Sequence, residues 1–558
     1  MKGFCHLVPI VFALGSWSPP VVCAQEILPE DHPKYMVVAE VFDDLVRAIG
    51  DGRTPPALYM EPRSAAGSMK VAWFLPARNS ITIQEQVYDL CQSFGPDSLN
   101  ALAVFLGHEL AHYYKDHGWV GDFGNGFADL QVGKRLGELG RDESKMVEIE
   151  TEADYFGGFF SRVAGYQTLG VAPRALAQVY TLYGLDTDIE GYPSLVERQE
   201  IARRSEEKLR RMIPIFEAGN RLLLIAEYEG AARCFEFIGR TFPSREILNN
   251  AGVARALEAV DLFDEGVLRY AYPIELDPET RLRGERSGLR GKHRADELAM
   301  RGSRKDRRSK LLKLARKSFD QARQKDPEYA TAYVNLACVA DLQGDFDEAA
   351  FLAQKGMKIA HSREEKVSLA HALIARGIAR ARGEDEQGAR RDFEEAGGAS
   401  LAGINLAVLD GGAVPSRVES AAESAAESAV EKIDGMGTFN YDPIAADPDV
   451  IVDLPRLDQE RPLVSISAKE TGSWRGWLVD MGYRAIAFLE TGPDYGGQSG
   501  RGVRIGHVFA QVVDVYGLPS STVAGRAGTY HVYAVSGIVF RTDADERVRS
   551  WTIFGIDE

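Results

Sequence analysis

The chain of 558 residues is longer than one hydrophobic core usually supports, so a prior of roughly 100 to 200 residues per domain predicts three or four units. Hydrophobic residues make up 45% of the chain and charged residues 26%, a composition that excludes a disordered or fibrous protein. The net charge of −17 disfavours binding of the whole protein to nucleic acid or to an anionic membrane surface.

The first 24 residues are typical of an export signal. A basic residue near the start precedes an apolar stretch from Phe4 to Trp17, and small residues end at Ala24. We therefore expect cleavage after Ala24 and no transmembrane span in the mature chain, because no later apolar run is long enough to cross a bilayer. The alternative is an uncleaved anchor, since Pro19 and Pro20 interrupt the segment.

Three cysteines lie outside this segment, at positions Cys91, Cys234 and Cys338. Their number is odd and their spacing shows no pairing, so the sequence predicts no disulfide framework. We expect them to be small buried side chains.

The segment from Asn100 to His117 carries the strongest chemical signal. Its apolar residues recur at helical spacing, which predicts an amphipathic helix. His108 and His112 are one helical turn apart, so both imidazoles project from the same face and can share one tetrahedral cation. Glu109 lies beside them, where a carboxylate can take a proton from water that the metal binds.

A second predicted helix, from Glu148 to Tyr166, is a source of a third ligand. Glu150 and Asp154 are four residues apart and share a helix face, so one can bind the metal while the other accepts a hydrogen bond from a ligand histidine. Spacing alone leaves three glutamates open for the third-ligand role. These are Glu148, Glu150 and Glu152.

The letters HELAH at 108–112, ETEADYFGG at 150–158 and AGY at 164–166 together resemble a family of gluzincin metallopeptidases. This family includes the HtpX protease, the CAAX prenyl endopeptidase and the periplasmic BepA protease, and the resemblance covers roughly Met36 to Arg204. It implies an α+β zincin-type domain that binds one Zn²⁺ per chain through His108, His112 and Glu150. It also implies that Glu109 is the general base of peptide hydrolysis.

Two further segments bear on this resemblance. Val71 to Ile83 resembles the strand pair that precedes the family's active-site helix, and its edge would pair with an extended substrate. Many family members carry a His-Pro pair where this chain has Tyr192 and Pro193. The hydroxyl of Tyr192 could donate to the oxyanion of a tetrahedral intermediate, and a surface turn is the alternative.

From about Phe216 the pattern changes to helical repeats typical of the tetratricopeptide (TPR) class. The clearest unit carries small, aromatic and glycine residues at the spacing of a 34-residue repeat. These residues are Ala332, Tyr333, Leu336, Ala337, Gly344, Phe346, Ala349 and Ala353. Stacked repeats form a superhelix whose concave surface normally binds polypeptide, so we expect polypeptide substrates or envelope proteins as partners.

The remaining segments differ sharply in composition. Residues from Arg281 to Lys317 contain fifteen basic residues against four acidic ones, which favours either a docking site for an anionic partner or a loop leading into a solvated helix. A repetitive run within Ser416 to Lys432 reads as a linker. The stretch from Leu463 to Glu558 is rich in β-forming residues and predicts a small β-rich domain.

The sequence therefore predicts five parts: a signal peptide (1–24), a metallopeptidase domain (25–212), TPR-like repeats with a basic insert (213–410), a linker (411–462) and a β-rich domain (463–558). A protease joined to repeats in an exported chain most resembles the BepA members of this family. The resemblance implies zinc-dependent cleavage of unfolded or misassembled envelope proteins in the periplasm, which is the predicted function. The alternative is a periplasmic chaperone or assembly scaffold with a latent peptidase site.

Overall fold

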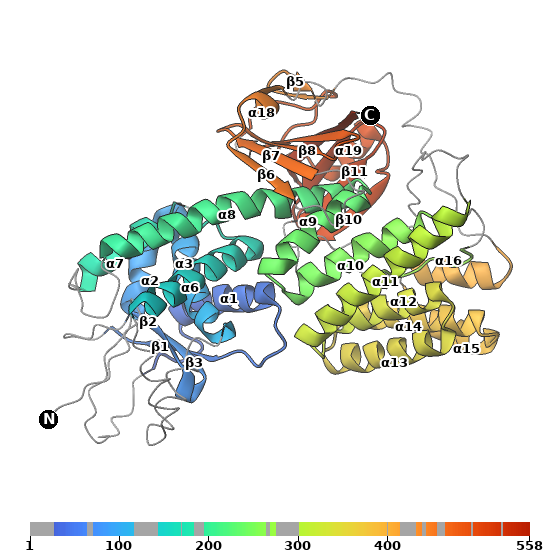
Figure 1. Cartoon of the computed structure of the whole chain (residues 1–558), viewed down its shortest axis with the longest axis horizontal. Coiled ribbons are helices and arrows are strands. Elements are labelled where there is room, and N and C mark those ends of the chain that lie inside the picture. The colour runs from blue at the N-terminus through green and yellow to red at the C-terminus, as the bar shows by residue number, and fades with distance from the viewer. Residues whose placement is uncertain are drawn as a thin grey trace. The chain divides into compact units, whose positions relative to one another are not determined.

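The chain divides into two compact units, Met1–Ile213 and Pro214–Glu558, and this division lies next to the boundary predicted after residue 212. The computed structural model describes residues 27–63, 71–115, 143–168, 170–183, 195–263, 268–274, 301–398, 400–412, 431–437, 442–454, 464–492, 495–525 and 528–557. The predicted signal peptide and Tyr192 lie outside the described residues, as does most of the predicted linker. Within these ranges the protein is mostly helical, with 16 α-helices and a separate eight-stranded sheet domain (Figure 1).

The first unit combines helices with a small sheet. Its helices are α1 (Pro33–Ile49), α2 (Glu85–Gln92), α3 (Ser98–Tyr114), α6 (Glu143–Ala164), α7 (Ala172–Tyr183) and the start of α8 (Leu195–Leu224), with short 3-10 turns at Pro76–Arg78 and Gly95–Asp97. Helix α3 lies at the centre, where it packs against α1 and α6. The two helices predicted from the histidine and glutamate segments are thus confirmed as neighbours.

The sheet of the first unit has three strands in the order β1-β3-β2. These strands are β1 (Ala57–Glu61), β2 (Ala72–Leu75) and β3 (Ser80–Gln84). Strand β2 pairs antiparallel with β3, which confirms the predicted strand pair, and the reversal passes through Asn79 with a positive φ of 46°. Strand β2 is an edge strand, and it contacts α3.

Most helices of the second unit follow one another as hairpins joined by short turns, whereas residues 261–300 separate α10 from α11. They are α9 (Tyr228–Thr241), α10 (Arg245–Val260), α11 (Arg301–Lys325), α12 (Ala330–Gln343), α13 (Phe346–Ser362), α14 (Lys366–Arg382), α15 (Glu386–Glu395) and α16 (Ser400–Leu409). The clearest predicted repeat unit corresponds to α12 and α13. Helix α12 ends at Gly344, whose φ of 92° suits a residue without a β-carbon.

The rest of the second unit is an antiparallel sheet in the order β10-β11-β12-β13-β9-β8-β7-β6, beside the short pair β4 (Lys432–Ile433) and β5 (Met436–Gly437) and helix α18 (Asp442–Ala446). The strands are β6 (Val450–Leu454), β7 (Val464–Glu470), β8 (Trp474–Asp480), β9 (Ala485–Thr491), β10 (Ser521–Gly525), β11 (Gly528–Tyr533), β12 (Ile538–Thr542) and β13 (Val548–Asp557). The predicted start of this domain at residue 463 is too late, because β6 pairs with β7 in the sheet. A short strand flanked by Asp and Pro gave too weak an alternation to be recognised.

The two faces of this sheet have different neighbours. Helix α19 (Phe509–Tyr516) buries Val512 and Tyr516 in a core with Phe540 and Trp551. Alternation along the strands places Trp477 and Glu490 on the opposite face. There Arg221 of α8 lies 3.6 Å above the Trp477 ring and forms an ion pair with Glu490.

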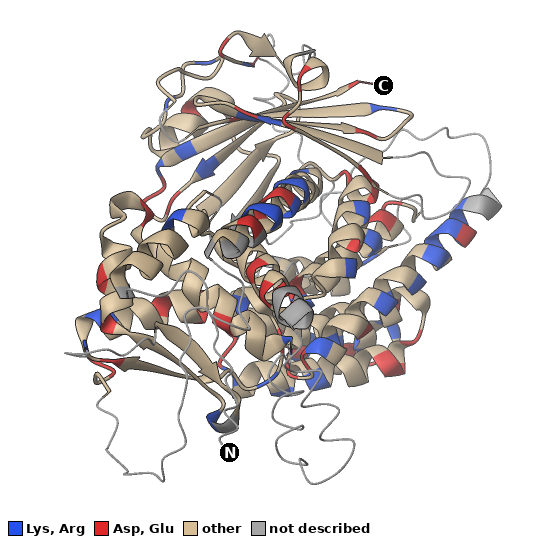
Figure 2. Ribbon diagram, turned by 60° about the vertical axis from the view of Figure 1, so that its left-hand side comes forward, with Lys and Arg blue, Asp and Glu red and all other residues tan. Residues whose placement is uncertain are grey.

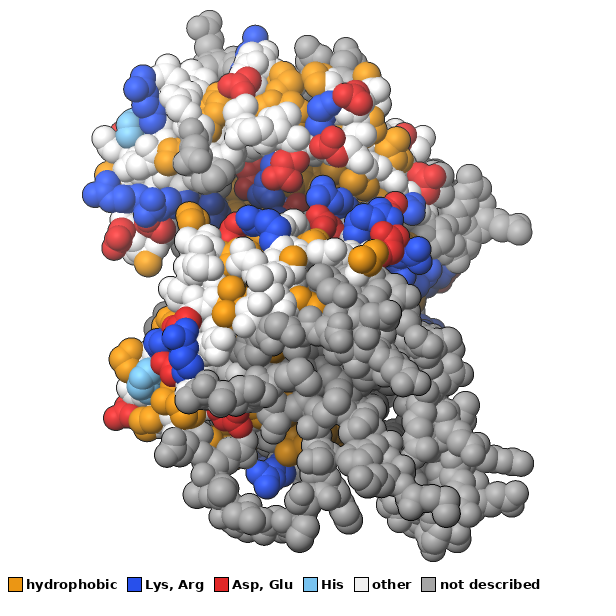
Figure 3. Space-filling view, turned by 90° about the vertical axis from the view of Figure 1, so that its left-hand side faces the viewer, with side chains coloured by type: hydrophobic (Ala, Val, Ile, Leu, Met, Phe, Trp, Pro, Cys, Tyr) orange, Lys and Arg blue, Asp and Glu red, His pale blue; other side chains and the backbone are white. Residues whose placement is uncertain are grey.

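Charged side chains of both signs intermingle on the molecular surface. Figure 2 shows Lys and Arg recurring along α11, and on the face drawn in Figure 3 basic and acidic side chains lie side by side. In the described part of the predicted basic insert, Arg307 pairs with Glu258 and Arg316 with Glu348. Ion pairs within the helical unit therefore neutralise part of this basic charge.

Two further expectations can be compared with the described residues. Cys91, Cys234 and Cys338 are buried, as predicted. No helix within these residues combines the length and the apolar character that crossing a membrane requires.

Candidate metal centre

Helix α3 carries three ionisable side chains into the core of the first unit. It is apolar almost all round, and Leu102, Leu106 and Leu110 are fully buried. His108, Glu109 and His112 are only 5%, 1% and 8% exposed. Burying imidazoles and a carboxylate in such surroundings is costly unless each of them meets a partner.

The partners of the two histidines come from α6, which crosses α3 at unusually close range. A β-carbon built on Gly157 would lie 2.6 Å from the carbonyl carbon and oxygen of Gly107 and 2.8 Å from the backbone nitrogen of His108. The two backbones can approach this closely only because both positions are glycine. The contact sets Asp154, about one turn before Gly157, and Glu150, about two turns before it, against the histidines.

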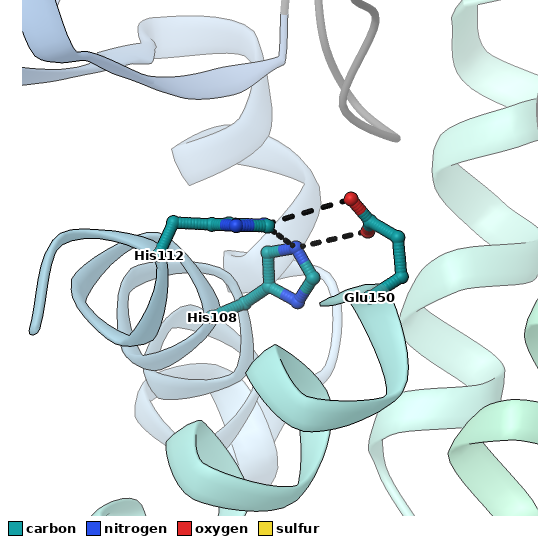
Figure 4. Close-up of side chains that lie close together, drawn as sticks. All are labelled: His108, His112 and Glu150. Atoms are coloured by element: carbon teal, nitrogen blue, oxygen red, sulfur yellow. Dashed lines mark hydrogen bonds and ion pairs between the residues drawn. The ribbon is translucent and has the colours of Figure 1, made fainter. Parts of the chain in front are cut away.

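His108, His112 and Glu150 point toward one another from the two helices (Figure 4). The distance from Nε2 of His108 to Nε2 of His112 is 2.9 Å, and to Oε2 of Glu150 it is 3.3 Å. Nε2 of His112 lies 3.6 Å from Oε1 of Glu150. Ligand atoms around one tetrahedral zinc ion, each about 2.0–2.1 Å from it, stand roughly 3.3 Å apart, so this group fits a single metal ion.

The outer nitrogen of His108 is occupied. Its Nδ1 lies 2.7 Å from Oδ1 of Asp154, and a carboxylate at that distance fixes the proton on Nδ1. The Nε2 of the neutral ring then offers a lone pair toward the space that the Glu150 carboxylate also faces. Two electron-rich atoms directed at the same point favour a cation between them.

The electrostatic environment of His108 leads to the same conclusion. Burial lowers the pKa of His108, but the hydrogen bonds to Asp154 and Glu150 outweigh it and raise this pKa to about 10. The surroundings therefore stabilise positive charge strongly at this point. A divalent ion can supply that charge in place of a proton.

Glu109 faces the sheet side of α3. Its Oε2 accepts a hydrogen bond of 2.7 Å from the backbone N–H of Phe74, which belongs to edge strand β2. An amide has a single hydrogen to donate, so Phe74 directs its N–H away from β3 and toward the helix. The Glu109 carboxylate therefore lies beside the outer edge of β2.

The structure places the competing glutamates differently. Glu150 is 1% exposed and faces the histidines, whereas Glu152 pairs with Lys115 at 2.7 Å with a side chain that is 39% exposed. The side chain of Glu148 and all of Tyr192 lie outside the described residues. Of the predicted site residues, the structure brings together His108, His112, Glu150 and Asp154.

Sequence reasoning missed three positions that shape this centre. Gly107 and Gly157 allow the helices to touch, and Phe74 holds Glu109 through its backbone. A glycine inside a helix costs about 1 kcal/mol relative to alanine, so the pair of glycines carried a detectable signal of close packing. The contribution of Phe74 is a main-chain N–H, which no residue type reveals.

Comparison with known proteins adds little. No family model and no curated protein matches this chain. Ten chains of solved structures match, among them a monomeric mutant of IFIT1 with m7Gppp-AAAA, at 10% sequence identity and a TM-score of 0.27. This match covers 57% of the present chain and 64% of the IFIT1 chain, which is less than two thirds of its length. A likeness this weak carries no argument about fold or function.

Proposed function

We propose that this protein is a zinc-dependent endopeptidase of the gluzincin class, which cleaves unfolded or misassembled proteins of the cell envelope after export to the periplasm. The observation that carries the proposal is the convergence of His108, His112 and Glu150 on one point. Imidazole and carboxylate ligands in this set are typical of catalytic zinc, which takes three protein ligands and leaves a fourth position for water or substrate.

The ligand residues and the base have separate tasks. His108, His112 and Glu150 hold the metal, and Asp154 orients His108 through its Nδ1 proton. Zinc, when bound, acidifies water and polarises a peptide carbonyl. Glu109 accepts a proton from the attacking water and returns it to the leaving amine, which a carboxylate buried among apolar residues is suited to do.

Strand β2 supports both the base and the substrate. Its backbone N–H at Phe74 donates to one oxygen of Glu109 and so orients the carboxylate for the proton transfer. We propose that an extended substrate pairs with the outer edge of β2, so that its scissile bond lies between Glu109 and the metal ligands. Tyr192 stays our candidate for the donor to the oxyanion.

The test is hydrolysis of casein by the mature chain, with Glu109→Gln as the decisive variant. Removing the general base is expected to lower the rate by a factor on the order of 10² to 10⁴ while zinc content stays at one per chain. Glu152→Gln is the matched control, because Glu152 is a partly exposed glutamate of α6 that pairs with Lys115. It should keep the parent rate.

Two outcomes would count against the proposal. Full activity of Glu109→Gln would show that the assigned base is wrong. A zinc-loaded parent chain that cleaves nothing, yet protects casein from aggregation, would favour the scaffold function with a latent site.

A further inference from the structure

A short irregular segment packs against α14, α15 and α16 of the repeat unit. Residues 268–274, with the sequence LRYAYPI, form neither helix nor strand, and Leu268, Tyr270, Ala271 and Pro273 are buried. Tyr270 and Ala271 belong to a hydrophobic cluster built mainly by α14, α15 and α16. This segment is far from those helices in sequence, so tertiary contacts alone hold it there.

Asn405 of α16 binds the backbone of this segment. The N–H of Ala271 donates to Oδ1 of Asn405 at 2.8 Å, and Nδ2 of Asn405 donates to the carbonyl oxygen of Ala271 at 2.9 Å. A side-chain amide that pairs with both polar groups of one residue does what a neighbouring β-strand does. Asn405 is fully buried, so an amide without such a partner would be costly at this position.

The next contact recognises a phenol. The hydroxyl of Tyr272 donates to Oδ1 of Asp341 at 2.6 Å and accepts from Nη1 of Arg382 at 2.8 Å. Arg382 also binds Asp341 directly, at 2.7 Å. Burial and the nearby Asp341 raise the pKa of Tyr272 well above its usual value, so its hydroxyl keeps the proton that it donates.

The remaining contacts are apolar. The ring of Tyr270 packs against Phe393 with centroids 6.5 Å apart. Ala271, between the two tyrosines, is the residue whose backbone meets Asn405, and a small side chain permits that approach. The site therefore recognises a tyrosine, a small residue and a second tyrosine in a segment that is neither helix nor strand.

The scaffold of the site does not come from the segment. Helix α12 packs against α14, and α14 packs against α16, so the helices support one another directly. Asp341, Arg382 and Asn405 come one from each of these helices. The segment thus occupies the site as a ligand would, with contacts that a separate polypeptide can reproduce.

We infer that α12, α14 and α16 form a peptide-binding groove whose ligand is a non-helical polypeptide segment of the pattern Tyr-small-Tyr, and that residues 268–274 occupy this groove in cis. The inference deepens the proposed function, because it names how a client chain is held, yet binding here needs no catalysis. A tethered occupant acts at an effective concentration near the millimolar range, so the parent chain should bind a free peptide weakly.

The experiment measures binding of fluorescein-labelled LRYAYPI by fluorescence anisotropy to the full mature chain carrying Glu109→Gln, which prevents cleavage of the probe. The opened variant carries Tyr270→Ala and Tyr272→Ala in addition, and these changes weaken the binding of residues 268–274 in the groove. This variant is expected to bind the probe at least tenfold more tightly than its parent. Adding Asn405→Leu, a change of similar side-chain volume, should reverse that gain.

Two control peptides distinguish specific recognition from non-specific binding. The peptide LRAAAPI lacks both phenols, and LRYAYPI with N-methylalanine in place of alanine lacks the single N–H that Asn405 accepts. Both are expected to bind the opened variant at least tenfold more weakly than LRYAYPI. Equal binding of all three peptides would overturn the inference.

Folding of the variants is checked by circular dichroism. A folded opened variant that binds LRYAYPI no better than the parent also overturns the inference. If the double substitution unfolds the repeats, the test moves to Tyr272→Phe, which removes only the hydroxyl. A threefold gain in affinity is expected there, and no gain would contradict the groove. Because the readout is binding alone, failure here leaves the proposed hydrolysis by the first unit intact.

Discussion

Two buried polar clusters in this protein are built on opposite principles. The cluster of α3 and α6 directs two imidazole nitrogens and a carboxylate at one point. The cluster of α12, α14 and α16 balances its groups, because Arg382 donates, Asp341 accepts and the Tyr272 hydroxyl does both. We propose that a cation from outside completes the first cluster, whereas a segment of the chain itself completes the second.

This difference explains why one cluster was readable from the sequence. Metal ligands must be of a few residue types at fixed spacing, so His108, His112 and Glu150 can be recognised in the sequence. A groove that binds a peptide backbone and a tyrosine hydroxyl can be built from many residue types at no fixed spacing. Here Ala271 and Asn405, which form a hydrogen bond, are 134 positions apart in the sequence. The comparison also predicts that the two clusters respond to different perturbations.

The largest contrast is expected on removal of metal. A metal present at about 1,000 times its Kd stabilises the folded form by about 4 kcal/mol, and a chelator should withdraw that stability from the first unit alone. Hydrogen exchange measured by mass spectrometry should show faster exchange in peptides from α3 and α6. Peptides from α12 to α16 should exchange at an unchanged rate, and a uniform change across both would contradict the separation.

A smaller effect is expected from Gly157→Ala. The new methyl group would meet the backbone of Gly107 and His108 at 2.6–2.8 Å, so α6 must move away from α3. We expect a loss of about 3 kcal/mol of stability and a weaker hold on the metal, measured by unfolding in urea and by competition with a chelator.

Gly158→Ala is its matched control. The added methyl group there meets only the tip of the Leu209 side chain, which can rotate aside. Stability should change by about 1 kcal/mol or less, with metal affinity unchanged. Equal metal loss in both variants would mean that the close contact of the helices is unimportant.

The smallest effect concerns a balanced charge cluster of the second unit and depends on pH. Burial raises the pKa of Glu490, but Arg221 and Arg475 outweigh burial and lower it to about 2. A carboxylate with a depressed pKa stabilises the fold above its unfolded pKa of about 4.3, and this stability is lost as the pH falls toward 2. At about 1.4 kcal/mol per pKa unit, the contribution is no more than about 3 kcal/mol.

Glu490→Gln tests this contribution. Unfolding of the second unit should become less dependent on pH between about 5 and 2, while the first unit keeps the parent's profile. An unaltered pH profile for the second unit would show that the ion pairs with Arg221 and Arg475 contribute little.

The sequence was most informative where a regular hydrophobic periodicity coincided with residue types that metal binding requires. The helix at 98–114 and the helix bearing Glu150 follow from periodicity, and the strand pair around Asn79 was predicted from the family resemblance. The residues that converge at the metal centre were also named from their spacing and from a family resemblance. Helix α12 and its glycine stop at Gly344 were predictable for the same reason.

Other features could not be read from the sequence because they depend on tertiary contacts. Strand β6 is five residues long and is defined by its pairing with β7, so it was assigned to a linker. The hydrogen bond from Phe74 to Glu109 uses the main chain. The segment at 268–274 carries no periodicity of either kind, and its position follows only from the helices around it.

The central claim is that His108, His112 and Glu150 bind one zinc ion, and metal content by mass spectrometry of the purified mature chain tests it most directly. The parent should contain one zinc per chain, while His112→Ala and Glu150→Ala should contain none and Glu152→Ala should keep it. A folded parent without metal, or full zinc content in the Glu150→Ala variant, would contradict the account.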